Sequence, residues 1–365
     1  MRVKKVVFIL LAVIVLGGVV GFFGYKYFIN KNFTLTAVVT PTPTPKLPKP
    51  ENFQWGINTT PNGLGDYSPE KWQQQLDIAK KLGVEWVRFA WEWQDGDNVF
   101  NRENAVLGAL WQNGFNVMMV LEPRPGWENA DTYKEGYELA KSVSSYYKGK
   151  IPLYQIVNEG DAMTVNSPTS SGEKTTDYDP VKYTKIKNYL EGASKGLKEG
   201  DPAAKTIITT VCTQTGYLDL VAADANIKFD YIGMDWYNWC DPIGSKKGDD
   251  GKTLTVTKLK SYGKPMIITE NNAWPSMDPA TRRSDIVDEN LQASTITDTA
   301  EWAYANKDWV KGYYVFSLFD DKFSDSPLYF GIYGSERQGV SISSVPTVAK
   351  KAYTTYQAII KKYSK

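Results

Sequence analysis

The fold is most constrained by an alternation of short β-rich runs and helical segments that starts at Phe53 and repeats eight times. Strands that alternate with helices form parallel sheets, because each helix returns the chain to the edge where the next strand begins. Several runs are continuously apolar, such as 117–121, which indicates strands covered on both faces. Eight units favour a closed (β/α)8 TIM barrel. A doubly wound open sheet is the alternative, but no Gly-x-Gly-x-x-Gly turn or P-loop follows any strand.

Capping residues support the helices between these strands. Ser68 and Pro69 open a helical segment that Gly83 closes, and Asp179 and Pro180 open another that ends at Gly200. The expected strands are 53–58, 86–91, 116–121, 153–158, 206–211, 231–236, 266–270 and 312–318. The expected helices are 68–83, 102–113, 132–147, 179–200, 217–224, 254–261, 281–305 and 347–361.

The first thirty residues have a different composition from the rest of the chain. Arg2, Lys4 and Lys5 precede an uncharged apolar run from Val6 to Gly24. A helix of that length spans roughly the ~30 Å hydrocarbon core of a bilayer, and basic residues ahead of it favour a cytoplasmic N-terminus. A cleaved signal peptide is the alternative, but the run is long for one and no clean Ala-x-Ala follows. We expect 1–30 to be a cytoplasmic stub and transmembrane anchor.

Two further segments follow the anchor. Residues 31–50 include the run 41–45, Pro-Thr-Pro-Thr-Pro, which predicts an extended linker. Residues 51–365 are long enough to form one barrel domain, and no second boundary is visible within them. We therefore expect a single-pass protein of the cell membrane with a monomeric extracellular domain, or a secreted protein if the N-terminus is cleaved.

Composition excludes several classes of function. Histidine is absent, so a Ser-His-Asp triad, a His-ligated zinc site and a histidine base are impossible. The net charge is +1 and no basic stripe is visible, so nucleic acid is not an expected partner. We expect no cofactor. We also expect no metal, since Asp249-Asp250-Gly251, the segment that could suggest calcium, is an ordinary turn. The only cysteines, Cys212 and Cys240, leave their pairing open.

Candidate site residues are found where apolar strands end in polar residues, because active sites of such barrels form at the C-terminal ends of the strands. The residues that meet this criterion are Asn58, Arg88, Glu92, Glu122, Asn158, Glu159, Asp235, Tyr237, Glu270, Asp320 and Asp321.

Two of these acids close strands that are otherwise mostly apolar. The run 153–159 ends in Asn158 and Glu159, and the run 266–270 ends in Glu270. An Asn-Glu pair after strand four and a glutamate after strand seven resemble the signature of glycoside hydrolase clan A, the retaining barrel glycosidases. The resemblance covers the chain from about Phe53 onward and identifies no family within the clan. It implies that Glu159 is the acid/base, that Glu270 is the nucleophile and that Asn158 binds the sugar 2-hydroxyl.

The same resemblance implies supporting roles for two more residues. Arg88 matches an arginine of strand two that keeps the nucleophile ionised, and Tyr237 matches a tyrosine of strand six that donates a hydrogen bond to it. Arg88 could instead pair a carboxylate at the barrel floor, and Tyr237 could be a rim aromatic. Asn58 is a further supporting candidate. Histidines that many clan members carry are missing, with Glu122 and Trp236 near those places.

Carboxylates and aromatic residues leave further alternatives open. Glu92 and Glu122 are rival catalytic acids, and Glu122 is also a candidate substrate-binding residue. Aromatic residues make up 13% of the chain, and their flat faces suit the apolar faces of sugar rings. We expect Trp91, Trp236, Trp274 and either Phe316 or Phe319 to contact substrate, although a tryptophan taken singly is more often a core residue. Other tryptophans near strand ends are Trp55, Trp93, Trp127 and Trp239.

The sequence therefore predicts a retaining glycosidase that acts on a β-linked polysaccharide or oligosaccharide by double displacement at the cell surface. The alternatives are a transglycosylase with the same site and a non-catalytic carbohydrate-binding barrel displayed on the cell. A non-catalytic barrel needs neither acid, whereas both are present in this chain. The glycosidase interpretation depends on Glu159 and Glu270 facing each other across one sugar.

Overall fold

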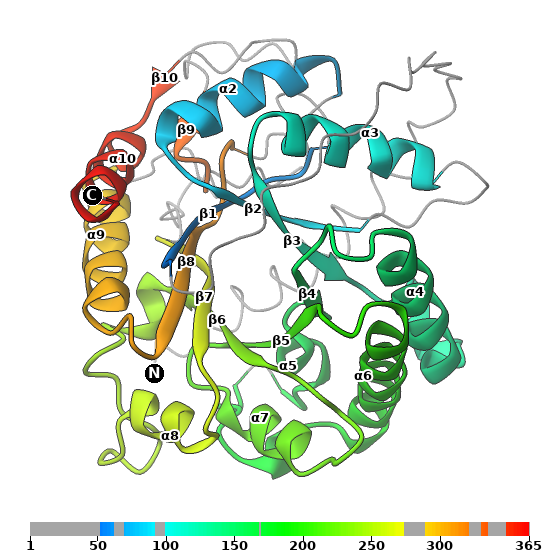
Figure 1. Ribbon diagram of the computed structural model, residues 1–365. Helices are drawn as coiled ribbons and strands as arrows, with labels where there is room; N and C mark the ends of the chain where they lie inside the picture. Colours follow the sequence, from blue (N-terminus) through cyan, green and yellow to red (C-terminus); the bar gives the residue numbers. More distant parts are fainter. Residues whose placement is uncertain are drawn as a thin grey trace, which may run out of the picture.

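In the computed structural model, eight parallel strands close into a barrel in the order β1 to β8 (Figure 1). The structure describes residues 52–61, 69–91, 99–167, 169–273, 289–320, 330–334 and 348–364. The predicted closed barrel is confirmed over the open sheet. The strands are β1 Gln54–Asn58, β2 Trp86–Ala90, β3 Asn116–Leu121, β4 Leu153–Ile156, β5 Lys205–Val211, β6 Tyr231–Tyr237, β7 Met266–Asn272 and β8 Val310–Val315.

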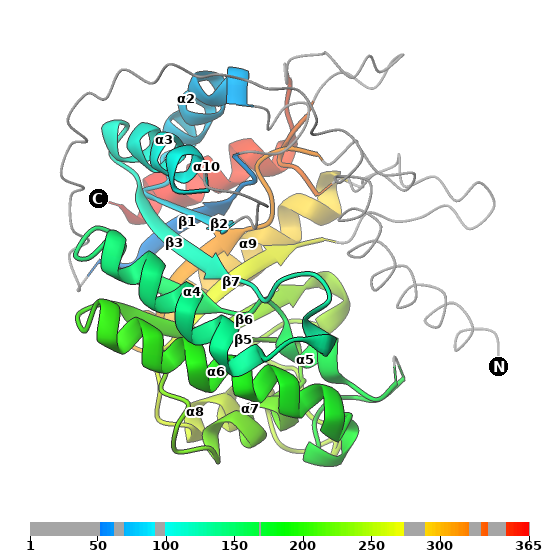
Figure 2. The ribbon, with the colours of Figure 1, turned by 90° about the vertical axis from the view of Figure 1, so that its right-hand side faces the viewer.

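Helices follow every strand and surround the barrel (Figures 1 and 2). They are α2 Trp72–Leu82, α3 Val99–Gln112, α4 Thr132–Tyr146, α5 Gly160–Thr164, α6 Pro180–Gly200, α7 Thr215–Ala222, α8 Thr255–Ser261, α9 Glu289–Ala305 and α10 Lys351–Tyr363. Each expected helix is present, although 281–288 lies outside the described residues. The short α5 was not predicted. A small antiparallel pair, β9 Tyr333–Gly334 and β10 Val348–Ala349, lies before α10.

The predicted caps explain the ends of the long helices. The Asp179 carboxylate accepts hydrogen bonds from the backbone N–H groups of Val181 and Lys182, at 2.8 and 3.0 Å, where α6 begins. These N–H groups have no partner inside the helix, so the cap satisfies them. Gly83 ends α2 with a φ of 93°, in the left-handed region that glycine adopts without steric cost.

Strand four ends earlier than expected. β4 stops at Ile156, because Val157 has a φ of 62° and leaves the sheet geometry. A β-branched residue rarely adopts this conformation. Asn158 and Glu159 therefore lie on the turn after the strand rather than at its end.

The interior of the barrel has two layers of side chains. The lower layer is apolar and consists of Trp86, Met118, Leu153, Ile207, Ile267 and Tyr314. Side chains of a strand return to the same face after two residues, so the next inward position lies one layer higher. The upper layer is polar and consists of Asn58, Arg88, Gln155, Thr209, Asp235, Thr269 and Glu270. The upper layer lies toward the C-terminal ends of the strands, where the site was predicted.

The expected anchor and linker, 1–30 and 31–50, lie outside the described residues. Within the described ranges, no helix combines the length and the apolar character that crossing a bilayer requires.

Candidate active site

Glu270 lies on β7 with each carboxylate oxygen held by a different side chain. The Arg88 guanidinium donates to Oε1 at 2.8 Å, and the Tyr237 hydroxyl donates to Oε2 at 2.5 Å. Glu270 is only 4% exposed, so these two donors replace the water that a carboxylate would otherwise bind. Burial raises the pKa of Tyr237 well above its ordinary value, and the charge of Glu270 adds to this effect, which keeps the phenol protonated as a donor.

An irregularity between β6 and β7 sets the direction of Glu270. Met234 pairs with Ile268, but the next pair is Asp235 with Glu270, so Thr269 is an extra residue on β7. Such a bulge re-aims the side chains that follow it. As a result Thr269 and Glu270 both reach the interior, and Asp235 and Glu270 become direct neighbours across the two strands.

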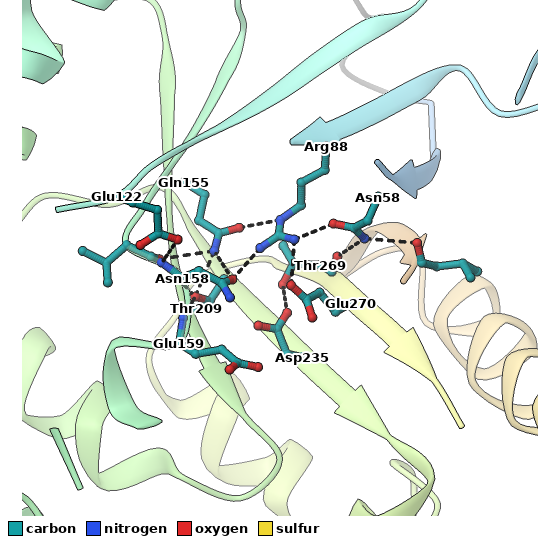
Figure 3. Close-up of polar contacts among 12 residues, drawn as sticks. Asn58, Arg88, Glu122, Gln155, Asn158, Glu159, Thr209, Asp235, Thr269 and Glu270 are labelled. Carbon is teal, nitrogen blue, oxygen red and sulfur yellow. Dashed lines mark hydrogen bonds and ion pairs between the residues drawn. The ribbon is translucent and has the colours of Figure 1, made fainter. Parts of the chain in front are cut away.

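Arg88 is the centre of the polar upper layer (Figure 3). Besides Glu270, its guanidinium donates to Asn58 Oδ1, to Gln155 Oε1 at 2.7 Å and to Asn158 Oδ1 at 2.6 Å. Burial lowers the pKa of Arg88, but the Glu270 and Asp235 carboxylates outweigh this and the net shift is upward. The cation is therefore permanent, and it pairs directly with the predicted nucleophile.

Asn58 supports Arg88 from the neighbouring strand β1, where the two residues pair directly. Its Nδ2 donates to the carbonyl oxygens of Thr269 at 2.9 Å and Val315 at 3.1 Å, while its Oδ1 accepts from Arg88. Both ends of the amide are thus engaged by protein groups. The geometry gives Asn58 a supporting position rather than one in contact with a ligand.

Glu159 starts helix α5 in the left-handed region, with a φ of 47°. Its backbone N–H donates to Thr209 Oγ1 at 3.2 Å, which fixes the turn. Burial raises the pKa of the Glu159 carboxyl well above its ordinary value, Glu270, Asp235 and nearby Asp161 raise it further, and Arg88 partly opposes them. Within the ranges described, the carboxyl makes no hydrogen bond.

Three carboxyl groups converge on one side of Arg88 (Figure 3). One oxygen each of Glu159, Asp235 and Glu270 lies within 4.8 Å of the others. The two predicted catalytic glutamates therefore face each other at the same end of the barrel. Oxygens this close could also share a cation, but Arg88 already supplies a positive charge to the cluster.

Asn158 lies between Glu159 and the arginine. Its Oδ1 accepts from Arg88 Nη2 at 2.6 Å and from Gln155 Nε2 at 2.9 Å, which fixes the orientation of the amide. Its Nδ2 has no acceptor in the described part of the chain and is available to a ligand hydroxyl. Glu122 lies behind Asn158 and accepts its backbone N–H at 3.1 Å. Burial raises the pKa of Glu122 to about 7.

Of the two rival acids, Glu122 is described and is not part of the carboxyl cluster. Glu122 contacts the backbone of Asn158 and is absent from the group of three converging carboxyls. Glu92 lies outside the described residues, as do Trp93, Trp274 and Asp321. Asp320 is buried and pairs with Lys350 at 2.6 Å.

The predicted aromatic residues occupy different places. Trp91 is 3% exposed and packs edge-on against Phe100 and Tyr147, and Trp236 is 1% exposed with its Nε1 donating to the Asp241 carbonyl at 2.9 Å. Both rings lie in the hydrophobic core, so little of either face is open to a sugar. Phe316 is half-buried, follows β8 and lies edge-on to Tyr237, with ring centroids 6.5 Å apart.

Trp239 was named among the tryptophans near strand ends, but not as a site residue. This ring is 43% exposed and stacks on Tyr237, with centroids 4.3 Å apart and an interplanar angle of 9°. Trp239 therefore stacks on the ring whose hydroxyl donates to Glu270. The signal available in the sequence was its position two residues after Tyr237, beyond the end of the strand.

Cys212 and Cys240 form a disulfide, with Cα atoms 5.4 Å apart. The bond joins the loops that follow β5 and β6. The Tyr237 N–H donates to Cys240 Sγ at 3.4 Å, so the disulfide also contacts the segment that carries Tyr237 and Trp239. It settles a pairing that the sequence left open.

No protein-family model matches the sequence, and neither does any curated protein. Solved structures do match. A β-glucosidase from Thermotoga maritima in complex with methyl acetic acid-substituted glucoimidazole has a TM-score of 0.64 at 16% identity, over 86% of this chain and 98% of that chain. The family 1 β-glucosidase of that organism with isofagomine lactam has a TM-score of 0.63 at 15% identity, with the same coverage of 86% and 98%. The complex with deoxynojirimycin has a TM-score of 0.63 at 15% identity, covering 87% and 99%. At this level of identity the likeness shows the fold.

Proposed function

We propose that the chain is a retaining glycosidase that hydrolyses β-linked oligosaccharides or polysaccharides, with Glu270 as nucleophile and Glu159 as acid/base. The observation that carries the proposal is the convergence of these two carboxyls to within 4.8 Å. Retaining enzymes hold their two carboxyls about 5–5.5 Å apart, whereas inverting enzymes leave about 6.5–9.5 Å for a water molecule.

The surroundings of the two glutamates suit opposite protonation states. Arg88 and Tyr237 each donate to one oxygen of Glu270, which stabilises the anion that attacks the anomeric carbon. Burial and the nearby acids raise the pKa of Glu159, which favours the protonated form that a general acid needs. In the first step that proton passes to the leaving oxygen as the glycosidic bond breaks and an ester to Glu270 forms.

The second step returns the enzyme to its starting state. Glu159, now a carboxylate, takes a proton from water as the water oxygen attacks the anomeric carbon and the ester to Glu270 breaks. The free Nδ2 of Asn158 donates to the sugar 2-hydroxyl, a contact that strengthens in the transition state. A sugar acceptor in place of water makes the same chemistry a transglycosylation.

The β linkage and the sugar class are supported by two observations. The fold is similar to that of solved β-glucosidases, although identity near 16% transfers no substrate by itself. Phe316 and the exposed Trp239 flank Tyr237 and offer apolar faces of the kind that stack on sugar rings.

The cellular location belongs to the proposal as well. The apolar run after Arg2, Lys4 and Lys5 supports a membrane anchor at 1–30, and the Pro/Thr-rich linker at 31–50 supports a monomeric domain, 51–365, held outside the cell. Membrane fractionation combined with protease treatment of intact cells tests this. Retention in the soluble cytoplasmic fraction overturns it.

The enzymatic proposal is tested by assaying the purified chain on a panel of aryl β-glycosides and β-glucans. Glu159→Gln and Glu270→Gln are compared with Glu199→Gln, a matched change on α6 in an exposed ion pair with Lys141. We expect turnover in the wild type and in Glu199→Gln, and its near loss in the two site variants. Substantial turnover in either site variant overturns the assignment, and sugar binding without turnover in the wild type supports the non-catalytic alternative.

A further inference from the structure

Asp235 is a third carboxyl in the site that the two-glutamate mechanism does not use. It lies on β6, is 0% exposed, and is the direct cross-strand neighbour of Glu270 because of the bulge at Thr269. The Thr269 hydroxyl donates to its Oδ1 at 2.6 Å. Its Oδ2 is buried and has no hydrogen-bond partner among the residues that the structure describes. A buried oxygen left this way requires a proton or a partner.

The charges around Asp235 come from five elements. β2 contributes Arg88, β7 contributes Glu270, and the turn after β4 contributes Glu159. Asp161 lies on α5, and Tyr237 lies two residues further along β6. Arg88 makes an ion pair with Glu270, and within the described ranges it makes none with Asp235.

One cation therefore faces three carboxyls whose oxygens lie within 4.8 Å of one another. Like charges this close in a buried site do not all ionise, as in sites where two carboxyls share one proton. Burial raises the pKa of Asp235 well above its usual range, Glu270 raises it further, and Arg88 and Thr269 only partly oppose these effects. The charge balance favours one anion beside Arg88 and two protonated acids.

We propose that Asp235 is a positioning residue that stays protonated while the enzyme turns over, and that its Oδ2–H donates a hydrogen bond to whichever glutamate is ionised. This inference rests on the proposed function of Glu159 and Glu270.

The proposal gives Asp235 a different partner in each step. Before the first step Glu270 is the anion, and Asp235 donates to it as Arg88 and Tyr237 do. Once Glu270 is esterified, Glu159 is the anion, and Asp235 donates to Glu159 after the two carboxyls, now within 4.8 Å, close to hydrogen-bond distance. No proton leaves Asp235 in either step. The cluster keeps a single negative charge throughout, which matches the single positive charge of Arg88.

The first test is infrared spectroscopy of the full chain at pH 7, since protonated carboxylic acids have a C=O stretching band that carboxylates lack. We expect one such band of the wild-type spectrum to be missing from the spectrum of Asp235→Asn, and a different band to be missing from that of Glu159→Gln. An unchanged band pattern in Asp235→Asn means that Asp235 is ionised and overturns the proposal. This readout does not depend on turnover, so it judges Asp235 even if the glycosidase proposal fails in the activity assay.

The second test is the pH profile of kcat/KM in two variants. Asp235→Asn keeps a neutral donor, and we expect less than a tenfold loss at the optimum, with a basic limb at the same or a higher pH. Asp235→Leu removes the donor at similar size, and we expect at least a hundredfold loss. If Asp235 is an anion in the wild type, Asp235→Asn removes a negative charge beside Glu159 and moves the basic limb down by about one pH unit or more, which contradicts the proposal.

Folding is controlled separately because Asp235 is buried. Thermal unfolding and far-ultraviolet circular dichroism identify a variant that fails to fold. If Asp235→Leu does not fold, the infrared spectrum and the pH profile of Asp235→Asn still test the proposal. Asp235→Asn is expected to fold, because Asn is close to Asp in size and keeps an acceptor for the Thr269 hydroxyl.

Discussion

The lower and upper layers of the barrel interior lie on the same strands and on the same face of the sheet, but the lower layer is apolar and the upper layer is polar. Trp86, Leu153 and Ile267 belong to the apolar lower layer. Two residues further on, Arg88 and Gln155 belong to the polar upper layer. A change of two positions along a strand therefore separates a region that stabilises the fold from one that carries reactive groups.

The two layers depend on each other. Burying a large apolar side chain stabilises the fold by about 1.5–3 kcal/mol, and the lower layer contributes six such side chains. Buried charges cost stability unless they are paired, and in the upper layer the Glu270 carboxylate is paired with Arg88. Five changes test this division between the layers.

The largest effect is expected for Glu270→Gln in the upper layer. The amide cannot attack the anomeric carbon, so kcat/KM falls by at least about 10³-fold. Steady-state kinetics on an aryl β-glycoside measure this. A loss of kcat/KM of less than tenfold means that another residue is the nucleophile.

A somewhat smaller effect is expected for Glu159→Ala. General acid catalysis contributes about 10²–10⁴-fold, and it matters most when the leaving group is a weak acid. We expect a large loss with an alkyl β-glycoside and a much smaller loss of the first step with a dinitrophenyl glycoside. Equal losses with both substrates contradict a role in protonating the leaving group.

Leu153→Ala truncates an apolar side chain of the lower layer, as Glu159→Ala truncates an acid of the site. Loss of a buried leucine costs about 2–5 kcal/mol, whereas we expect kcat of the folded enzyme to stay within about threefold. Urea unfolding and kinetics on the same preparation measure both quantities. A hundredfold fall in kcat with intact folding breaks the proposed division between the layers.

Glu122→Gln tests how the stability cost of a buried acid that follows β3 and contacts the Asn158 backbone depends on pH. In the folded chain the pKa of Glu122 is raised to about 7. In the unfolded chain Glu122 has its ordinary, lower pKa, so it loses its proton at a lower pH than it does in the folded chain. Its contribution to stability is therefore full below the unfolded pKa and is lost as the pH rises to about 7. We expect Glu122→Gln to be the more stable protein at pH 8 by an amount on the order of 2 kcal/mol, and similar to wild type at pH 4. Equal unfolding free energies at pH 8 contradict this.

The smallest effect is expected at the rim, for Trp239→Ala. An aromatic stacking contact contributes about 0.5–1.5 kcal/mol, which corresponds to a rise in KM of about 2- to 12-fold. The rise should appear with oligosaccharides and be small with short aryl glycosides. Trp309→Phe, directly before β8 and so at the opposite end of the strands, is the control. An effect on kcat alone argues against a binding contact.

The sequence predicted the parts of the site that depend on local patterns. Strand order and the two acids at strand ends follow from periodicity, because a polar residue that ends an apolar run marks the edge of a parallel sheet. Arg88 and Tyr237 were predicted from the resemblance, and the structure places both on Glu270.

The missed features depend on contacts between distant segments. The bulge at Thr269 arises from pairing between β6 and β7 and has no local signal, so the position of Asp235 beside Glu270 was not foreseen. Trp91 and Trp236 were expected near substrate but lie in the core, because a tryptophan beside a strand end has the same pattern whether its ring turns inward or outward. The disulfide needed a Cα distance that only the folded chain provides.

The most direct test of the site is to find which of the three converging acids forms a bond to the sugar. A 2-fluoro β-glycoside with a good leaving group should slow breakdown of the covalent intermediate, so that peptide mapping by mass spectrometry can locate it. We expect one sugar adduct on the peptide that contains Glu270 and none in Glu270→Gln. An adduct on Glu159 or Asp235, or a product of inverted configuration, contradicts double displacement through Glu270.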